Sequence, residues 1–186
     1  ARIQQFYFET LKIPREKFRF KELNDEEKAF YNKYHFDLEI ELDEHGFTEV
    51  GGLHYRTDHD LKGHQEVSGE KMEIFDESSK ERFIPHVLEL SFGVDRNIYA
   101  LLDLGMDDDG RGNKVLRLSP KVSPFTCAVF PLVKNKDPVR DKALEVYERL
   151  RGRVSTFYDE GGSIGRRYAR QDEVGTPYCI TVDFDT

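Results

Sequence analysis

The sequence predicts two units of different fold class, an α+β unit over residues 1–110 and a smaller α/β unit over residues 111–186. Three observations support this division. Strand patterns in the first unit are joined by short connections, which is typical of an antiparallel sheet. Apolar strands alternate with helices in the second unit, which indicates a largely parallel sheet. The polar, glycine-rich segment 107–113 separates the two rhythms, and we interpret it as a flexible linker.

The first unit opens with a helix, because the apolar residues of segment 2–12 recur at helical spacing until Pro14 ends the pattern. A second, short helix is expected over 25–34, where an acidic turn suits a helix N-terminus. Segments with strand character supply an antiparallel sheet and include a hairpin. They are 36–42, a return strand from Phe47, 71–75 and 83–92. A last helix over 94–104 follows almost without a loop.

The second unit shows strand and helix patterns in alternation. Strands are expected over 127–133, 154–159 and 178–184, and helices from Asp137 to about Arg151 and from Ser163. This spacing predicts a small α/β domain.

The charge differs between the two units. Residues 1–110 carry 14 Lys and Arg against 26 Asp and Glu, a net charge of −12, whereas residues 111–186 carry 14 against 10, a net charge of +4. The total of −8 argues against a protein that is simply a basic cover for nucleic acid. The basic second unit is the better candidate for contact with phosphates.

The composition also argues against several classes of protein. No segment approaches the run of about 18 apolar residues that a membrane span needs, and the chain does not open with a signal-peptide pattern. We therefore expect a cytoplasmic protein that does not bind membranes. Cys127 and Cys179 have neither a C-x-x-C partner nor a zinc-ligand spacing, so we expect two reduced, buried thiols.

Residues with chemical potential meet where the last strand of the first unit joins its helix. Alternation places Glu89 and Ser91 on one face of the strand, and the apolar residues between them (Leu88, Leu90 and Phe92) are expected to face a core. Arg96 lies in the first turn of the helix, where a cation opposes the helix dipole unless an anion sits in front of it. The segment is a candidate site for a phosphate or carboxylate; the alternative is that Asp95 compensates Arg96 at a solvated helix start.

Three motifs resemble those of one enzyme family. The segment that joins the last strand to its helix resembles the third signature motif of class II aminoacyl-tRNA synthetases; its sequence is SFGVDRNIYALL. An overlapping segment is close to the glycyl-tRNA synthetase version of that motif; its sequence is HVLELSFGVDR. A glycyl-enzyme block with E-x-x-G, an arginine and Asp-x-Asp-Leu resembles TEVGGLHYRTDHDLKGH. The anticodon-binding domain of that family resembles GGSIGRRYARQDEVGTPYCITVDFDT. Because the motifs occur in the family's order, the chain is identified as similar to glycyl-tRNA synthetases of the archaeal and eukaryotic type.

The resemblance implies an activity and its site residues. A homodimer would activate glycine with ATP, which arrives with magnesium, and transfer the glycyl group to glycine tRNA without a tightly bound cofactor. The amino group of glycine is implied to lie near Glu49, Glu89 and Ser91, and ATP near Glu89 and the catalytic Arg96; the magnesium ligands stay open. A carboxylate about 4 Å from an ammonium contributes about 4 kcal/mol at an effective dielectric near 20.

The resemblance is partial. Leu90 replaces the proline of the family's Glu-Pro-Ser-Phe-Gly form, and the first and second class II motifs are absent. We therefore interpret residues 1–110 as the C-terminal part of a catalytic domain, with a partial antiparallel sheet, and residues 111–186 as a truncated anticodon-binding domain. The alternative is a catalytically inactive, synthetase-derived module that binds RNA or a protein partner.

Two acidic or histidine-rich segments are candidate metal sites. His54, His59 and His64 lie five residues apart, with Asp58 and Asp60 between them. This spacing suits neither a helix face nor a strand face, so we favour a polar loop near the active site. The acidic run before Gly110 lacks the later ligands of a calcium loop.

A basic cluster begins the last predicted helix. Ser163 is expected to be its N-cap, and Arg166 and Arg170 then share one face with Arg167 beside them. A solvated basic face is the alternative. In a domain that resembles a tRNA-binding module, we expect these arginines to contact tRNA phosphates.

Overall fold

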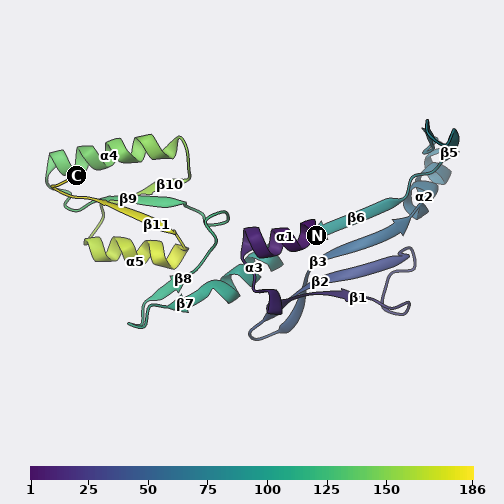
Figure 1. Cartoon of the computed structure of the whole chain (residues 1–186), viewed down its shortest axis with the longest axis horizontal. Helices are drawn as coiled ribbons and strands as arrows, with labels where there is room; N and C mark the ends of the chain where they lie inside the picture. Colours follow the sequence, from purple (N-terminus) through teal and green to yellow (C-terminus); the bar gives the residue numbers. More distant parts are fainter. The chain divides into compact units, whose positions relative to one another are not determined.

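The computed structural model describes residues 1–186 as two compact units (Figure 1). One unit is formed by Arg15–Ala100, and the other by Ala1–Pro14 together with Leu101–Thr186. The division falls within a helix and not in the glycine-rich segment. The domain boundary expected between residues 110 and 111 stays a prediction.

A four-stranded antiparallel sheet is the centre of the Arg15–Ala100 unit (Figure 1). Its strands lie in the order β1 (Phe18–Glu22), β2 (Tyr34–Leu42), β3 (Gly46–Thr57) and β6 (Val87–Phe92). Leu38, Ile40 and Leu42 are buried and alternate along β2, because successive side chains of a strand point to opposite faces. The predicted hairpin of β2 and β3 and the predicted antiparallel sheet are confirmed.

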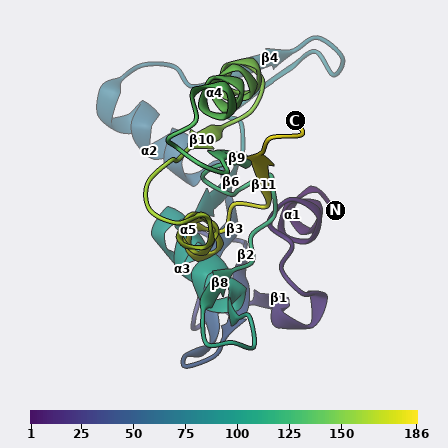
Figure 2. The same ribbon diagram turned by 90° about the vertical axis from the view of Figure 1, so that its left-hand side faces the viewer.

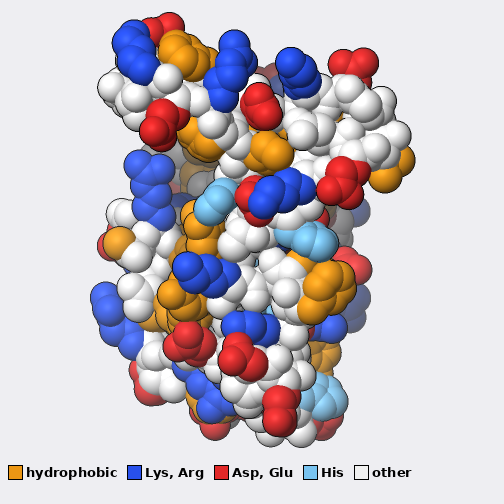
Figure 3. Space-filling view, turned by 90° about the vertical axis from the view of Figure 1, so that its right-hand side faces the viewer, with side chains coloured by type: hydrophobic (Ala, Val, Ile, Leu, Met, Phe, Trp, Pro, Cys, Tyr) orange, Lys and Arg blue, Asp and Glu red, His pale blue; other side chains and the backbone are white.

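Shorter elements connect β3 to β6. They are helix α2 (His59–Ser68) and a hairpin of β4 (Ile74–Asp76) and β5 (Glu81–Phe83). This end of the unit exposes hydrophobic side chains among charged ones (Figure 3), including Val67, Phe75 and Phe83. After β6, helix α3 (Val94–Gly105) follows Gly93 directly, as predicted.

The short helix expected over 25–34 is wrong, because this segment forms turns. One helical hydrogen bond forms, from the N–H of Lys28 to the carbonyl oxygen of Asn24 at 3.0 Å. The N–H of Lys33 then donates to the carbonyl oxygen of Tyr55 on β3 at 2.8 Å. This cross-strand bond draws the chain into β2 before a second helical turn is complete.

The other unit contains the predicted α/β arrangement. Its parallel sheet has the order β10 (Thr156–Tyr158), β9 (Cys127–Pro131) and β11 (Tyr178–Val182). Helices α4 (Asp137–Arg151) and α5 (Ile164–Val174) cover opposite faces of this sheet (Figures 1 and 2). A buried cluster of Val129, Val139, Ala143 and Val182 joins β9 and β11 to α4. The predicted fold class is therefore confirmed for both units.

Helical turns and a hairpin complete the unit formed by Ala1–Pro14 and Leu101–Thr186. Helix α1 (Arg2–Gln5) continues as a π-helix (Phe6–Leu11), which confirms the predicted N-terminal helix. In the Arg15–Ala100 unit, a single 3₁₀ turn, Arg15–Lys17, precedes β1. The segment interpreted as a linker is instead the loop of a hairpin between β7 (Met106–Asp108) and β8 (Lys114–Leu116). None of the helices combines the length and the apolar character that crossing a membrane requires.

Candidate functional site

The candidate site lies on the polar face of the four-stranded sheet. Residues that lie directly opposite each other in antiparallel strands point to the same face. His54 of β3 lies opposite His35 of β2 and Glu89 of β6, and Gly52 of β3 lies opposite Ser91 of β6. Both glycine-site residues predicted on β6 therefore share one face with residues of the neighbouring strands.

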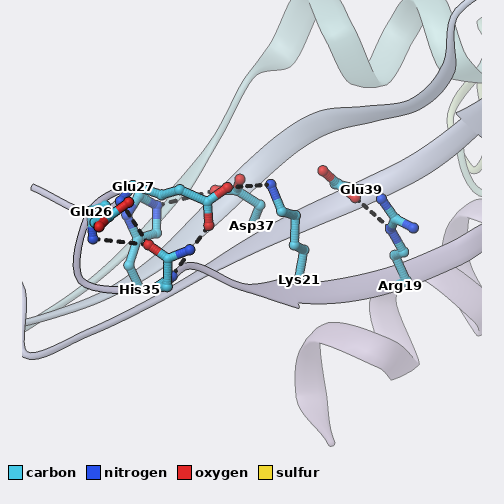
Figure 4. A network of polar contacts seen from close by, with 8 residues as sticks. Arg19, Lys21, Glu26, Glu27, His35, Asp37 and Glu39 are labelled. Atoms are coloured by element: carbon cyan, nitrogen blue, oxygen red, sulfur yellow. Dashed lines mark hydrogen bonds and ion pairs between the residues drawn. The ribbon is translucent and has the colours of Figure 1, made fainter.

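Charged residues of β1 and β2 extend this face (Figure 4). Arg19 forms a 2.5 Å ion pair with Glu39, and His35 Nε2 lies 3.1 Å from a carboxylate oxygen of Asp37. Burial raises the pKa of Asp37, and the nearby negative charge of Glu49 adds to the shift. The face thus concentrates carboxylates close to the residues expected to hold glycine.

A β-bulge at Val50 brings Glu49 onto the polar face. Leu38 of β2 lies opposite Gly51, whereas the next residue of β2, Glu39, lies opposite Glu49, so Val50 has no counterpart on β2. In a regular strand, alternation would turn Glu49 to the apolar face, because one residue of register shift moves a side chain to the other side of the sheet.

The same bulge anchors the start of α3. The carbonyl oxygen of Val50 accepts a hydrogen bond from the N–H of Gly93 at 3.0 Å. Arg96 donates from Nη1 to the carbonyl oxygen of Glu49 at 3.0 Å and to its carboxylate at 3.1 Å. The partner of Arg96 is therefore Glu49 and not the neighbouring Asp95.

The pair of Arg96 and Glu49 is open to solvent. Their side chains are 59% and 48% exposed, and an ion pair at such a surface contributes at most about 1 kcal/mol. A phosphate or carboxylate ligand with several negative oxygens therefore competes with Glu49 for Arg96 at little cost.

Glu89 belongs to a group of three charges, which we call the Arg56 triad, with Arg56 and Asp60. Arg56 donates from Nη1 to Glu89 at 2.5 Å, and from Nε and Nη2 to the two oxygens of Asp60 at 2.7 and 2.8 Å. Its guanidinium also lies 4.4 Å from the ring centre of Tyr31. These hydrogen bonds hold the pKa of Glu89 and of Asp60 below their usual values. With one cation and two carboxylates, the triad carries a net charge of −1.

Two consecutive glycines of β3 lie next to β6, Gly52 on the polar face opposite Ser91 and Gly51 on the apolar face opposite Phe92. A Cβ at Gly51 would lie 2.7 Å from the carbonyl oxygen of Ser91, which is closer than real Cβ atoms approach a backbone oxygen. A Cβ at Gly52 would collide with Nε2 of His54. The absence of a side chain at Gly51 therefore permits close packing of β3 and β6, and its absence at Gly52 makes room for the His54 ring on the polar face.

The histidine-rich segment is not the polar loop that its spacing indicated. His54 lies in β3, whereas His59 and His64 lie in α2. Asp60 belongs to the Arg56 triad, and Asp58 forms a 2.7 Å ion pair with Lys62. No group of three or more His, Cys, Asp or Glu side chains in residues 1–186 is arranged to hold a metal ion.

The apolar face of β6 differs from the expectation. The side chains of Leu88, Leu90 and Phe92 were expected to lie in a core, but they are 68%, 45% and 39% exposed. The alternation itself is correct, because all three lie on the face opposite Glu89. Since β6 is an edge strand, the sheet provides no neighbour on one side to cover them.

The three arginines of α5 have different surroundings. Arg167 is 2% exposed and donates to the carbonyl oxygens of Pro131 and, at 2.9 Å, of Gly162. Arg170 pairs with Asp159. Arg166 is exposed and free of ion pairs. The expected basic face therefore consists of Arg166 and the half-exposed Arg170, because Arg167 fastens α5 to the end of β9.

Ser163 is the N-cap residue of α5, as predicted, but its side chain makes no capping hydrogen bond.

Sequence reasoning did not select Arg56 or Asp37 of the polar face, and it considered His54 only as part of a candidate metal cluster. Arg56 was visible as the arginine of the E-x-x-G block, although its pairing with Glu89, 33 residues away, was not. Asp37 carried no sequence signal beyond alternation with apolar neighbours, and the spacing of His54 with His59 and His64 did not indicate its place beside Glu89.

Comparison with known proteins identifies similar sequences for nearly the whole chain. Residues 126–186 match the family model of an anticodon binding domain. A glycine–tRNA ligase of Clostridium acetobutylicum is 44% identical over 180 residues, which cover 95% of this chain and 38% of that protein. Glycine–tRNA ligases of Borrelia garinii subsp. bavariensis and Chlorobaculum tepidum are 43% and 42% identical, over 97% and 98% of this chain and 42% and 38% of those proteins.

The chain thus spans about two fifths of the length of these curated relatives. The matches agree with the resemblance to glycyl-tRNA synthetases. They come from bacteria, so they do not confirm the archaeal and eukaryotic type.

Proposed function

We propose that this chain is the part of a glycine–tRNA ligase that holds glycine, contacts ATP and binds the anticodon end of glycine tRNA. One observation carries the proposal: Glu49 of the E-x-x-G block and Glu89, Ser91 and Arg96 of the third class II motif converge on one polar face. The similarity to glycine–tRNA ligases over nearly the whole chain supports this assignment.

The Arg56 triad supports a site for the ammonium of glycine. Its net charge of −1 becomes zero when one ammonium binds beside Glu89, and the Ser91 hydroxyl supplies a further hydrogen-bonding oxygen. Glycine offers no side chain, so selectivity for it depends on charge recognition and on walls that clash with a β-carbon.

Arg96 is the proposed contact for ATP, which arrives with magnesium as a substrate complex. Its guanidinium lies in the first turn of α3, where an anion is favoured, and its pair with Glu49 is weak enough to be exchanged. Glu89 lies on the same face and is the proposed carboxylate near ATP. Catalysis then depends on positioning and charge neutralisation, without a protein nucleophile.

The second unit is the proposed tRNA-binding part. Arg166 and Arg170 lie on the surface of α5, inside the segment that matches an anticodon binding domain. Arg167 is proposed to support this surface from within. A homodimer in the cytoplasm and the archaeal and eukaryotic type of the enzyme complete the proposal, as the resemblance implies.

A substitution of Glu89 tests the glycine site. In the full-length gene product that contains this chain, Glu89→Gln should reduce glycine-dependent ATP–pyrophosphate exchange by about 10-fold to 100-fold, since a charged hydrogen bond contributes about 1.5–3 kcal/mol. Glu77→Gln is the matched control, because Glu77 pairs only with Lys80 at an exposed hairpin. Unchanged exchange in Glu89→Gln would contradict the assignment and favour a binding module without catalysis.

A further inference from the structure

His54 lies among the residues proposed to hold glycine and has no role so far. On the polar face, its neighbours across the sheet are His35 of β2 and Glu89 of β6. The centres of the His54 and His35 rings are 4.1 Å apart. His54 is two residues from Gly52, so its side chain lies next to the position of Gly52 on this face.

A buried amide fixes the ring proton of His54. Asn32 is 4% exposed, and its Nδ2 lies 3.2 Å from Nδ1 of His54. In this orientation the amide NH₂ of Asn32 donates, so Nδ1 accepts the hydrogen bond and carries no proton. In the neutral ring, the proton therefore resides on Nε2.

This Nε2–H lies above Gly52. A Cβ at Gly52 would collide with Nε2 of His54, so the nitrogen occupies the space that any other residue at position 52 would fill. Ser91 of β6 and Asp37 of β2 are directly opposite Gly52 on either side. Nε2 thus lies between the register positions of Ser91 and Asp37, on the face that carries the residues proposed to hold glycine.

Burial and several neighbouring charges shift the pKa of His54, and burial has the largest effect. Burial and the neighbouring His35 lower the pKa of His54, as does Arg56, whereas the carboxylates of Glu89 and Asp37 act in the opposite direction. A second proton on Nδ1 would also face the donor group of Asn32. Both effects keep His54 neutral near pH 7.

We propose that neutral His54, with its tautomer fixed by Asn32, donates its Nε2–H to a carboxyl oxygen of the amino-acid substrate bound on the polar face beside the His54 ring. This inference rests on the proposed function, which supplies the substrate class. A neutral donor holds the oxygen without competing with the ammonium for Glu89, as a cation would. His54 is then a substrate-binding residue, and Asn32 is a positioning residue.

The tautomer is tested in the 186-residue chain by long-range ¹H–¹⁵N spectra of its histidine rings. The His54 signals are assigned by their loss in His54→Gln. We expect the Nε2–H form at pH 7, and a raised pKa of His54 in Asn32→Asp, where a carboxylate replaces the amide donor. An Nδ1–H form in the unsubstituted chain overturns the inference whatever the enzyme activity is.

The contact with substrate is tested by exchange kinetics of the full-length gene product. We expect His54→Leu to raise the KM for glycine by about 10-fold to 100-fold, the effect of one hydrogen bond to a charged group, and to leave the KM for ATP unchanged. His54→Gln should recover part of the loss, because its amide also donates. His64→Leu, on the exposed surface of α2, is the control.

The outcomes separate this inference from the proposed function. If His54→Leu leaves the KM for glycine unchanged while Glu89→Gln reduces exchange, the role of His54 is wrong and the function stands. If neither substitution affects exchange, the proposed function is wrong, and the role of His54 falls with it.

Discussion

Replacing Arg167 by methionine should destabilise the unit that holds α5, whereas the same change at Arg166 should not. Arg167 is buried and donates to the carbonyl oxygens of Pro131 and Gly162. Each hydrogen bond from a charged donor contributes about 1.5–3 kcal/mol. Loss of these bonds destabilises the fold, because two carbonyl oxygens lose their donor. Removal of the buried guanidinium partly offsets this loss, because its Nε has no hydrogen-bond partner. We therefore expect a net loss of about 2–3 kcal/mol.

Native-state hydrogen exchange measures this loss in the right unit. A destabilisation of about 2–3 kcal/mol should lower the protection of the β9 amides by about 30-fold to 150-fold, since each 1.4 kcal/mol is about tenfold. Peptides from β2, in the other compact unit, report whether the effect is local. Arg166→Met should change protection by less than about threefold, because exposed substitutions stay within about 0.5 kcal/mol.

Binding of glycine tRNA gives the complementary readout. If Arg166 contacts a phosphate, Arg166→Met should weaken tRNA binding. It should also reduce the slope of log affinity against log salt concentration by about 1, the value for one phosphate contact. Equal protection of β9 in Arg167→Met and the unsubstituted chain would refute the structural role of Arg167. An unchanged salt slope in Arg166→Met would place the RNA elsewhere.

Two further predictions concern the four-stranded sheet. Gly51→Ala should lower the free energy of unfolding by about 1–3 kcal/mol, because its Cβ would lie 2.7 Å from the carbonyl oxygen of Ser91. Gly63→Ala, in open space on α2, should raise the free energy of unfolding by about 0.5–1 kcal/mol. Thermal unfolding of both variants measures the two opposite changes. The hydrogen bond from Arg56 lowers the pKa of Glu89 from 4.5, so the fold is stabilised above pH 4.5 and loses this contribution as the pH falls through the lowered pKa. Arg56→Met should therefore flatten the dependence of Tm on pH below 4.5, and an equally steep dependence would count against the Arg56 triad.

The sequence by itself determined the main strands and helices and the order of the motifs. Alternation predicted β2 and β3 and the face shared by Glu89 and Ser91, and helical spacing predicted the span of α4. These patterns were sufficient because a side chain's direction within one strand or helix depends only on its neighbours in the chain.

Only the tertiary structure decided which side chains meet. Arg96 and Glu49 are 47 residues apart, and their contact depends on the bulge at Val50, which no alternation pattern reveals. Arg167 looked like a surface cation in the sequence, but the packing of α5 on β9 buries it. Burial and long-range pairing depend on elements distant in the sequence, so they are fixed when the elements pack together and not by local propensity.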